Sequence, residues 1–286
     1  MSLKLHPFWG ACLVLASSTA FAGNHGDDPS PAARSAAGSA EALGIVWDAR
    51  AVEHLYSRAG FGASRREIER GVKKGVTGLV DELLNERYEE DPFFYERMGI
   101  DDAERMRDLE REERRKLIRE RNRADRLQMQ AFGAWWIDRM IEGHDPLRER
   151  MTLFWHGFFT SSYKEVSRSD EMIAQNELFR EHGLGSYRAL LHGIVRDPAM
   201  LRYLNNDKNR KQAPNENLAR ELMELFTLGE GNYTEEDVKE AARALTGHRA
   251  NRQGEFDVRW RSKDRGPKTI LGVEGRHDAK TLVEIL

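Results

Sequence analysis

The clearest local pattern in the chain lies at residues 215–229, where the sequence is NENLARELMELFTLG. Asn215 is a residue type that commonly caps a helix N-terminus, and a glycine like the last residue commonly follows a helix C-terminus. At 100° per residue, the leucines and the phenylalanine gather on one face, whereas Arg220 and Glu224 fall on the opposite side. The stretch therefore predicts an amphipathic helix over residues 216–228.

The same capping and periodicity signals recur along most of the chain. Asp145 and Pro146 form a strong helix start, after which apolar residues recur at the offsets of a buried helix face. Thr234 and Asp237 are placed to cap another helix. Helices are predicted over residues 64–74, 77–84, 103–140, 145–158, 169–181, 186–195, 198–204, 216–228 and 234–245.

One region has the alternation that is typical of a β-strand. Phe256, Val258 and Trp260 alternate with polar residues, and a Gly-Pro turn then leads toward residues 269–271. We therefore expect a mainly α fold, a multi-helix orthogonal bundle with one small β-hairpin near residues 255–271.

The charge composition argues against a nucleic-acid-binding protein. The 286 residues include 45 Lys and Arg and 48 Asp and Glu, so the net charge of −3 creates no global attraction for polyanions. Residues 103–126 hold ten basic and seven acidic residues, and this mixture of signs favours a solvated helix. We expect no nucleic-acid partner.

The first 22 residues have the features of a secretory signal peptide. Lys4 supplies the positive charge, residues 8–16 form a short apolar run, and residues 20–22 form a small-x-small cleavage site. The apolar run is too short for a stable membrane span, so we expect no transmembrane span in the mature chain. We therefore expect an exported protein, either periplasmic or extracellular.

The remaining chain divides by composition into a leader and one domain. Residues 23–44 are rich in Ala, Ser, Gly, Pro and Asp and predict a flexible leader, and residues 45–286 predict a single helical domain. Cys12 is the only cysteine and lies in the signal peptide, so the mature chain has no thiol for catalysis or disulfides. The chain stops at Leu286 inside an apolar-periodic stretch, which predicts a domain truncated at its C-terminus.

Three stretches resemble one bacterial family, the domain of unknown function 1800. They are HLYSRAGFG at residues 54–62, LFWHGFFTSS at 153–162, and residues 199–247, which include AMLRYLNND and NENLARELMELFTLGEGNYTEEDVKEAARALTG. The resemblance runs from about Trp47 to the end of the chain. It implies an exported, mainly helical protein of unestablished activity, with a sulfatase-like partner of the domain of unknown function 1501 family. It also implies that C-terminal helices are missing.

The chain departs from the family pattern at three positions. Phe158 replaces a second histidine after His156, His248 replaces a tryptophan, and Lys263 replaces the histidine of a His-Asp pair. If those histidines form a functional site in the family, the resemblance implies that this copy is impaired.

His156 is the first candidate for chemistry. Glu149 precedes it by seven residues, which returns to the same helix face within about 20°. A buried histidine held by a carboxylate can act as a general base or a metal ligand. The alternative, which we favour, is a structural histidine in a polar helix interface.

The second candidate is the helix that begins near Asn215. Arg220 and Glu224 can form an exposed pair four residues apart, and Glu221 flanks the apolar face. Glu221 is therefore the carboxylate expected to be buried, and beside Arg243 it would form a paired charge. We take Glu149, His156 and Glu221 as candidate catalytic residues. The candidate ligand-binding residues are Asn215, Asn217, Arg220, Glu224 and Arg243.

The third candidate is a calcium loop. Asn205, Asp207, Asn209 and Glu216 stand at positions 1, 3, 5 and 12, the spacing of oxygen ligands in a helix–loop–helix calcium site. Arg210 replaces the usual glycine at position 6, and the adjacent lysines add repulsion. The set predicts a site for calcium or another divalent metal, and asparagine turns and helix caps explain the same residues without metal.

These observations favour an exported binding or scaffold protein with a polar cluster that can hold a metal. The alternative is an envelope hydrolase that uses a carboxylate, a histidine or a metal-activated water.

Overall fold

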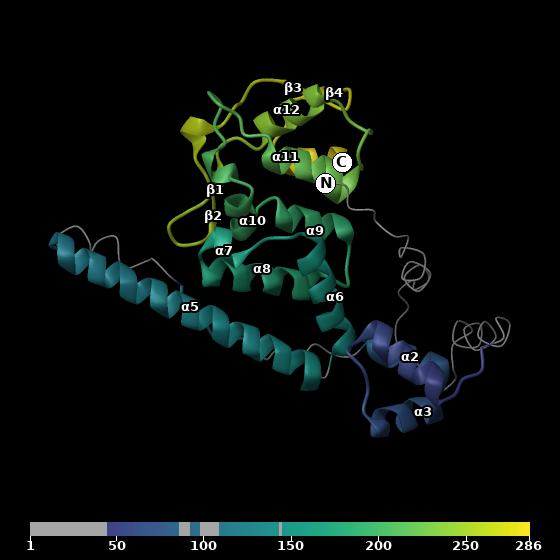
Figure 1. Cartoon of the computed structure of the whole chain (residues 1–286). Helices are drawn as coiled ribbons and strands as arrows, with labels where there is room; N and C mark the ends of the chain where they lie inside the picture. Colours follow the sequence, from purple (N-terminus) through teal and green to yellow (C-terminus); the bar gives the residue numbers. More distant parts are fainter. Residues whose placement is uncertain (1–44, 86–91, 98–108, 143–144) are drawn as a thin grey trace, which may run out of the picture. The chain divides into compact units, whose positions relative to one another are not determined.

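The computed structural model describes residues 45–85, 92–97, 109–142 and 145–286 (Figure 1). The predicted signal peptide and leader, residues 1–44, lie outside the described residues. Trp47–Leu286 form one compact unit, and helices make up most of it. The mainly α fold class with a small β component is confirmed.

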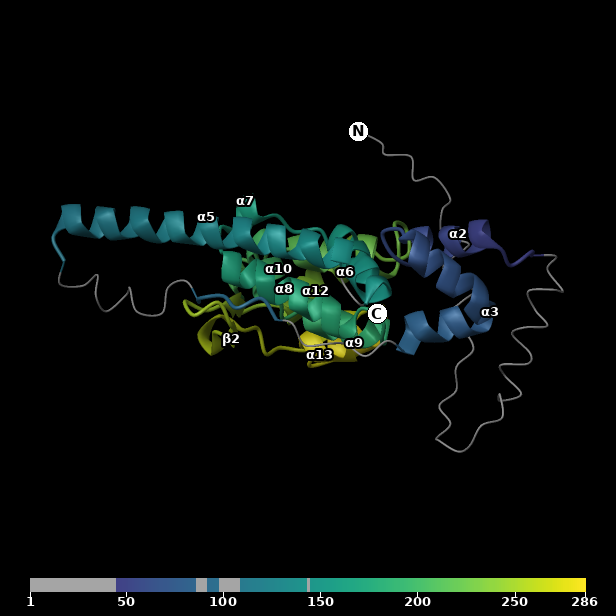
Figure 2. The same ribbon diagram turned by 90° about the horizontal axis from the view of Figure 1, so that it is seen from below.

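The first helices are α2 (Ala49–Ala59), α3 (Arg65–Asn85), α5 (Arg111–Glu142), α6 (Pro146–Phe158), α7 (Tyr163–Val166), α8 (Ser169–His182), α9 (Tyr187–Ile194) and α10 (Pro198–Tyr203). They are followed by the 3₁₀ turn η1 (Asn206–Lys208), α11 (Asn217–Glu221), the π-helix η2 (Leu222–Thr227), α12 (Glu235–Ala244), the 3₁₀ turn η3 (Trp260–Ser262) and α13 (Ala279–Ile285). Figure 2 shows α5 as one uninterrupted helix. None of the described helices is both long and apolar enough to span a membrane.

Two of the predicted helix caps form as expected. Asp145 accepts a hydrogen bond from the backbone N–H of Arg148, and Pro146 occupies the first position of α6. Thr234 and Asp237 make the two reciprocal hydrogen bonds of a capping box at the start of α12. These side chains satisfy backbone donors that the first helical turn leaves unpaired.

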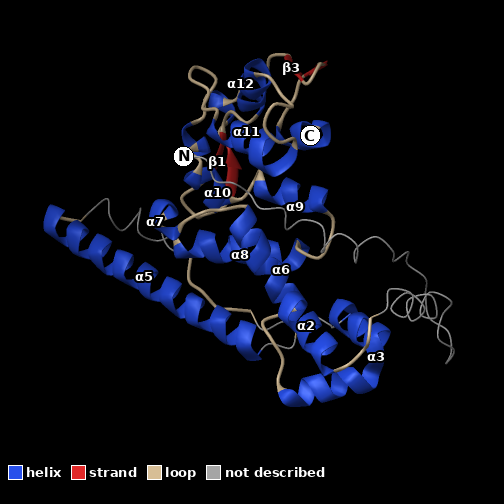
Figure 3. Ribbon diagram, turned by 45° about the vertical axis from the view of Figure 1, so that its right-hand side comes forward, coloured by secondary structure: helices blue, strands red, loops and turns tan. Residues whose placement is uncertain are grey.

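Two small antiparallel sheets replace the predicted hairpin (Figure 3). The strand β1 (His248–Ala250) pairs with β2 (Phe256–Val258), and β3 (Lys268–Ile270) pairs with β4 (Val273–Gly275). Both predicted strand segments exist, but they do not pair with each other. Trp260 begins η3 instead of extending β2. Strand β1 contacts α10, and β3 lies against α12.

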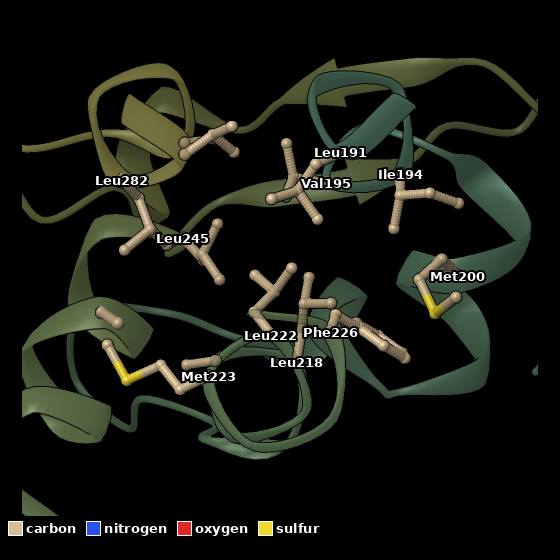
Figure 4. Packing of buried hydrophobic residues seen from close by; sticks show 14 of the residues in the cluster. Leu191, Ile194, Val195, Met200, Leu218, Leu222, Met223, Phe226, Leu245 and Leu282 are labelled. Carbon is tan, nitrogen blue, oxygen red and sulfur yellow. The ribbon is translucent and has the colours of Figure 1, made fainter. Parts of the chain in front are cut away.

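The main hydrophobic core joins the helices from α8 to α13. Figure 4 shows its side chains converging from α9, from α11 with η2, and from α13. Its buried members include Leu191, Ile194, Val195, Met200, Leu218, Leu222, Met223, Phe226, Leu245 and Leu282.

The π-helix η2 changes which residues of the 216–228 stretch are buried. The wider i→i+5 turn alters the angular spacing of side chains relative to an α-helix. Leu222, Met223 and Phe226 lie in the core, but Leu225 is 60% exposed. The prediction that Leu225 belongs to the buried face is therefore wrong.

Candidate functional site

Glu149 lies at the junction of α5, α6 and α8 and is fully buried. Arg139 Nε donates to its Oε1 at 2.7 Å, and Trp136 Nε1 donates to Oε2 at 2.9 Å. Arg180 donates to both oxygens, from Nε at 2.9 Å and from Nη2 at 3.1 Å. Glu149 is thus the shared counter-ion of two arginines.

The pKa of Glu149 reflects this arrangement. Burial raises the pKa of Glu149, but the hydrogen bonds and charges of Arg180 and Arg139 lower it by more than burial raises it. The pKa therefore lies below the ordinary value for a glutamic acid. A buried carboxylate held ionised by two guanidinium groups is a structural ion pair more often than a proton-transfer group.

His156 does not take Glu149 as its partner among the contacts of the described chain. Its ring lies edge-on to the Trp136 indole, with centroids 5.5 Å apart. Burial lowers the pKa of His156 below its ordinary value. The two residues share a helix face as predicted, but both oxygens of Glu149 are taken by the donors of α5 and α8. A catalytic role for either residue stays a prediction.

Two charge pairings expected near α11 are also different in the structure. Arg220 donates to Glu235 at 2.8 and 2.9 Å and to Glu216 at 3.1 Å, whereas Glu224 accepts from the hydroxyl of Tyr233 at 2.9 Å. The predicted Arg220–Glu224 pair therefore does not form, because Glu235 of α12 and Glu216 one turn earlier take the guanidinium.

Glu221 is half-buried and lacks the expected arginine partner. Arg243 binds Asp264 at 2.8 Å and Glu240 at 2.6 Å instead. Burial raises the pKa of Glu221, repulsion from Glu224 adds to the rise, and Arg220 opposes it. Glu221 is thus half-buried and not the fully buried carboxylate expected from the sequence, and it does not pair with Arg243.

The asparagines of the predicted calcium loop hold the loop together. Asn209 Nδ2 donates to Asn206 Oδ1 at 3.0 Å and to the Ala242 carbonyl at 2.9 Å. Asn209 Oδ1 accepts the backbone N–H of Asn215 at 3.0 Å, and Asn215 Oδ1 accepts that of Asn217 at 3.1 Å. The asparagine-turn and capping explanation therefore accounts for these side chains.

The other members of the predicted calcium set have different surroundings. Asn205 Oδ1 accepts from the Lys208 ammonium at 2.8 Å, Glu216 pairs with Arg220, and Asp207 is exposed. In the part of the chain that the structure describes, no group of three or more His, Cys, Asp or Glu is placed to hold a metal ion. The calcium site stays a prediction.

The same loop is joined by its backbone to a second segment about 50 residues later. The Lys211 N–H donates to the Ser262 carbonyl at 2.8 Å, and Gly247 connects Asn209 with Arg259 through bonds of 3.0 and 2.8 Å. Gly247 has a φ of +81°, and a Cβ atom there would lie 2.8 Å from the Arg259 carbonyl oxygen. Glycine is therefore needed for this close approach.

Residues 207–212 and 259–265, here called the cationic loops, carry seven Lys and Arg and two Asp. They line two hollows. The first, of about 210 Å³, is lined by Asp207, Lys208, Asn209, Arg210, Gly247, Arg249, Arg259 and Ser262. The second, of about 660 Å³, is lined by Lys211, Gln212, Trp260, Arg261, Lys263, Asp264 and Arg265.

Most of this positive charge has no acidic partner. Within residues 45–85, 92–97, 109–142 and 145–286, all seven basic side chains of the cationic loops lack an ion pair. Arg249, beside them, is bound by Asp257, and Asp264 is bound by Arg243. The acids that line the hollows thus neutralise little of the cationic loops.

A family model described as "Protein of unknown function (DUF1800)" matches residues 54–286, most of the chain. The chain belongs to the domain of unknown function 1800 family. No curated protein and no solved structure matches it.

The three positions at which the family resemblance predicted departures fall in different surroundings. Phe158 packs among the rings of Trp155, Phe159 and Phe226. His248 is buried, and burial together with the charge of Lys263 lowers its pKa to about 4, so its imidazole is neutral at pH 7. Its Nδ1 has no hydrogen-bond partner among the described residues.

The cationic loops are the feature that sequence reasoning missed in this member of the domain of unknown function 1800 family. In the sequence, Lys208 and Lys211 were considered only as charges that repel calcium. The available signal was the string RWRSKDR at residues 259–265, which has a basic residue at every second position. Its convergence with residues 207–212 depends on the Gly247 contact and is invisible in linear sequence.

Proposed function

We propose that this protein is an exported binding protein that holds an anionic ligand on the cationic loops. The observation that carries the proposal is that seven basic side chains, none of them in an ion pair with a described residue, line two hollows. Exposed lysines and arginines commonly serve only solubility. These differ because they gather around concave surface in a chain whose net charge is −3.

The electrostatics favour a bound anion. Like charges held close together repel one another, and an anion between them converts that repulsion into attraction. Guanidinium groups donate paired N–H groups that match a carboxylate or phosphate, as Arg210 and Arg259 can do in the first hollow. Its volume of about 210 Å³ suits one such group better than a large ligand.

Binding is favoured over catalysis because Glu149, the most buried of the candidate catalytic residues, serves as a counter-ion for Arg139 and Arg180. Export rests on the signal-like sequence of residues 1–22. A sulfatase-like partner of the domain of unknown function 1501 family remains a prediction from the family resemblance.

A hydrolase is the second candidate, and one observation favours it. Glu221 is half-buried and its pKa is raised by burial, which is the direction of shift that a carboxyl general acid requires. If the protein hydrolyses a substrate through this carboxyl group, Glu221→Gln should abolish the activity while leaving anion affinity unchanged.

Calorimetric titration with inorganic pyrophosphate at fixed ionic strength tests the binding proposal. We expect saturable binding that weakens at least tenfold in the double variant Arg210→Gln/Arg259→Gln. The control is Arg114→Gln/Arg115→Gln, which removes the same charge from exposed positions of α5. An absence of saturable binding, or equal losses in both double variants, would contradict the proposal.

A further inference from the structure

Trp260 stands at the second hollow with 62% of its surface exposed. It is the first residue of η3, and it packs in none of the hydrophobic clusters of the described chain. Single exposed apolar residues are ordinary on protein surfaces, so the exposure of Trp260 is informative only because the residue also lines a hollow.

Two basic side chains lie against the Trp260 ring. Lys263 Nζ is 5.5 Å from the ring centroid, and Arg265 Cζ is 5.6 Å from it. Cation–π attraction over these distances orients a cation but leaves its charge uncompensated. Asp278 attracts Lys263 at longer range without forming an ion pair with it. The ring therefore presents Lys263 and Arg265 to a further anion.

From this geometry we propose that the second hollow binds an acidic saccharide, a sugar chain that carries carboxylate, sulfate or phosphate groups. This inference rests on the proposed anion-binding function and names its ligand class. The apolar C–H face of a sugar ring packs on the exposed part of the Trp260 indole that these two side chains leave open, and the acidic group is held by Lys263 and Arg265. Lys211 and Arg261 hold acidic groups on neighbouring sugar units.

Each simpler ligand leaves part of this surface unused. A neutral sugar packs on the indole but gives the lining cations no counter-charge. An inorganic anion neutralises the cations but leaves the indole exposed to water. The hollow of about 660 Å³ lies within the range of small-molecule sites and has room for more than one ring.

A single-stranded nucleic acid also offers flat rings and negative charges. Sites for such strands place several aromatic side chains in succession along a basic groove. Trp260 is the one aromatic residue among those that line the two described hollows. The surface therefore favours one stacked ring surrounded by charges, as a saccharide provides.

Titration of the full chain with trigalacturonate tests the inference, with maltotriose, pyrophosphate and a short oligothymidylate as comparison probes. We expect trigalacturonate to bind and maltotriose to bind at least tenfold more weakly. Trp260→Ala should weaken trigalacturonate at least tenfold and change pyrophosphate affinity less than twofold. The matched control is Phe94→Ala, which removes an aromatic ring that is 90% exposed elsewhere.

The outcomes separate this inference from the proposed function. If pyrophosphate binds and trigalacturonate does not, the saccharide inference is wrong and the anion-binding function stands. If oligothymidylate binds more tightly than trigalacturonate and needs Trp260, the ligand is a nucleic acid and the inference is wrong. If neither pyrophosphate nor trigalacturonate binds, both proposals fail. Unchanged melting temperatures of the Trp260 and Phe94 variants show that lost affinity is not lost folding.

Discussion

Arg180 of α8 donates two hydrogen bonds to the carboxylate of Glu149 of α6, and each residue is only 1% exposed. Arg139 and Trp136 of α5 donate to the same carboxylate. One buried acid thus joins three helices. A carboxylate with four donors is a structural junction, which is why we assign function to the cationic loops instead.

Glu149→Gln should lower the free energy of unfolding by about 3–5 kcal/mol, since it removes the buried counter-charge that Arg139 and Arg180 share. Urea unfolding measures this loss. In a double-mutant cycle, Glu149 should couple strongly to Arg180 but be additive with His156→Gln within about 0.5 kcal/mol. Strong coupling between Glu149 and His156 would show that the pairing expected from the sequence forms in solution.

Ionisation of Glu149 should also make the stability of the fold fall in acid. Its pKa is lowered by folding, so its stabilising contribution is present above the unfolded pKa of about 4.3 and is lost as pH falls toward the folded pKa. Glu149→Gln should therefore reduce the steepness of acid unfolding below pH 4.3. A variant that unfolds in acid as steeply as the wild type would contradict this ionisation.

Asp197 and His248 should make stability depend on pH in opposite directions. Burial raises the pKa of Asp197 to about 7, with a smaller effect from Glu171, and burial lowers that of His248 to about 4. The raised Asp197 pKa stabilises the fold at low pH, and this contribution is lost as pH rises from about 4 through 7. The neutral His248 stabilises above the unfolded pKa of about 6.5, and its contribution is lost as pH falls toward 4.

Comparison of each single variant with the wild type should therefore reveal the contribution of the group that the variant removes. Relative to the wild type, Asp197→Asn should gain stability as pH rises from 4 to 7, because the amide does not titrate in this range. Its oxygen can still accept from Gln175 and Met200. His248→Phe should lose stability relative to the wild type as pH rises from 4 to 6.5. Urea midpoints measured at each pH check both slopes, and slopes of the same sign in the two variants would contradict the assignment.

The effect of calcium on the melting temperature distinguishes an anion-binding site on the cationic loops from a calcium-binding site. Because Lys208, Arg210 and Lys211 repel a divalent cation, we expect millimolar calcium to leave the melting temperature unchanged, whereas phosphate raises it through linkage of binding to folding. A rise with calcium that Glu216→Gln abolishes would instead support the calcium site at Asn205, Asp207, Asn209 and Glu216.

Export has its own test. If residues 1–22 are a signal peptide, the protein isolated from cells should begin near Gly23 and be found outside the cytoplasm. N-terminal sequencing of protein from fractionated cells decides this. An intact Met1 on the cytoplasmic protein would contradict it.

Local chemistry explains which parts of the fold the sequence predicted. The caps at Asp145 and Thr234 depend on residues within one helical turn, so their sequence signals were sufficient. Leu225 was misplaced because the π-helix η2 breaks the 100° spacing that the helical projection assumed.

Contacts between distant residues explain what the sequence could not predict. Glu149 and His156 do share a helix face, but the donors that occupy Glu149 come from α5 and α8. The cationic loops lie about 50 residues apart and meet at Gly247, where a close backbone approach decides the geometry. Neither relationship has a periodic signal in the chain.

The most direct test of anion binding follows the arginine Nε–Hε signals by NMR during titration with inorganic phosphate. The signals of Arg210 and Arg259 are assigned from the glutamine variants, and those of Arg114 and Arg115 serve as internal controls. The anion-binding proposal predicts saturable shifts of the first pair at phosphate concentrations that leave the control signals unmoved. Shifts that grow linearly without saturation, or that appear equally on α5, would contradict a site on the cationic loops.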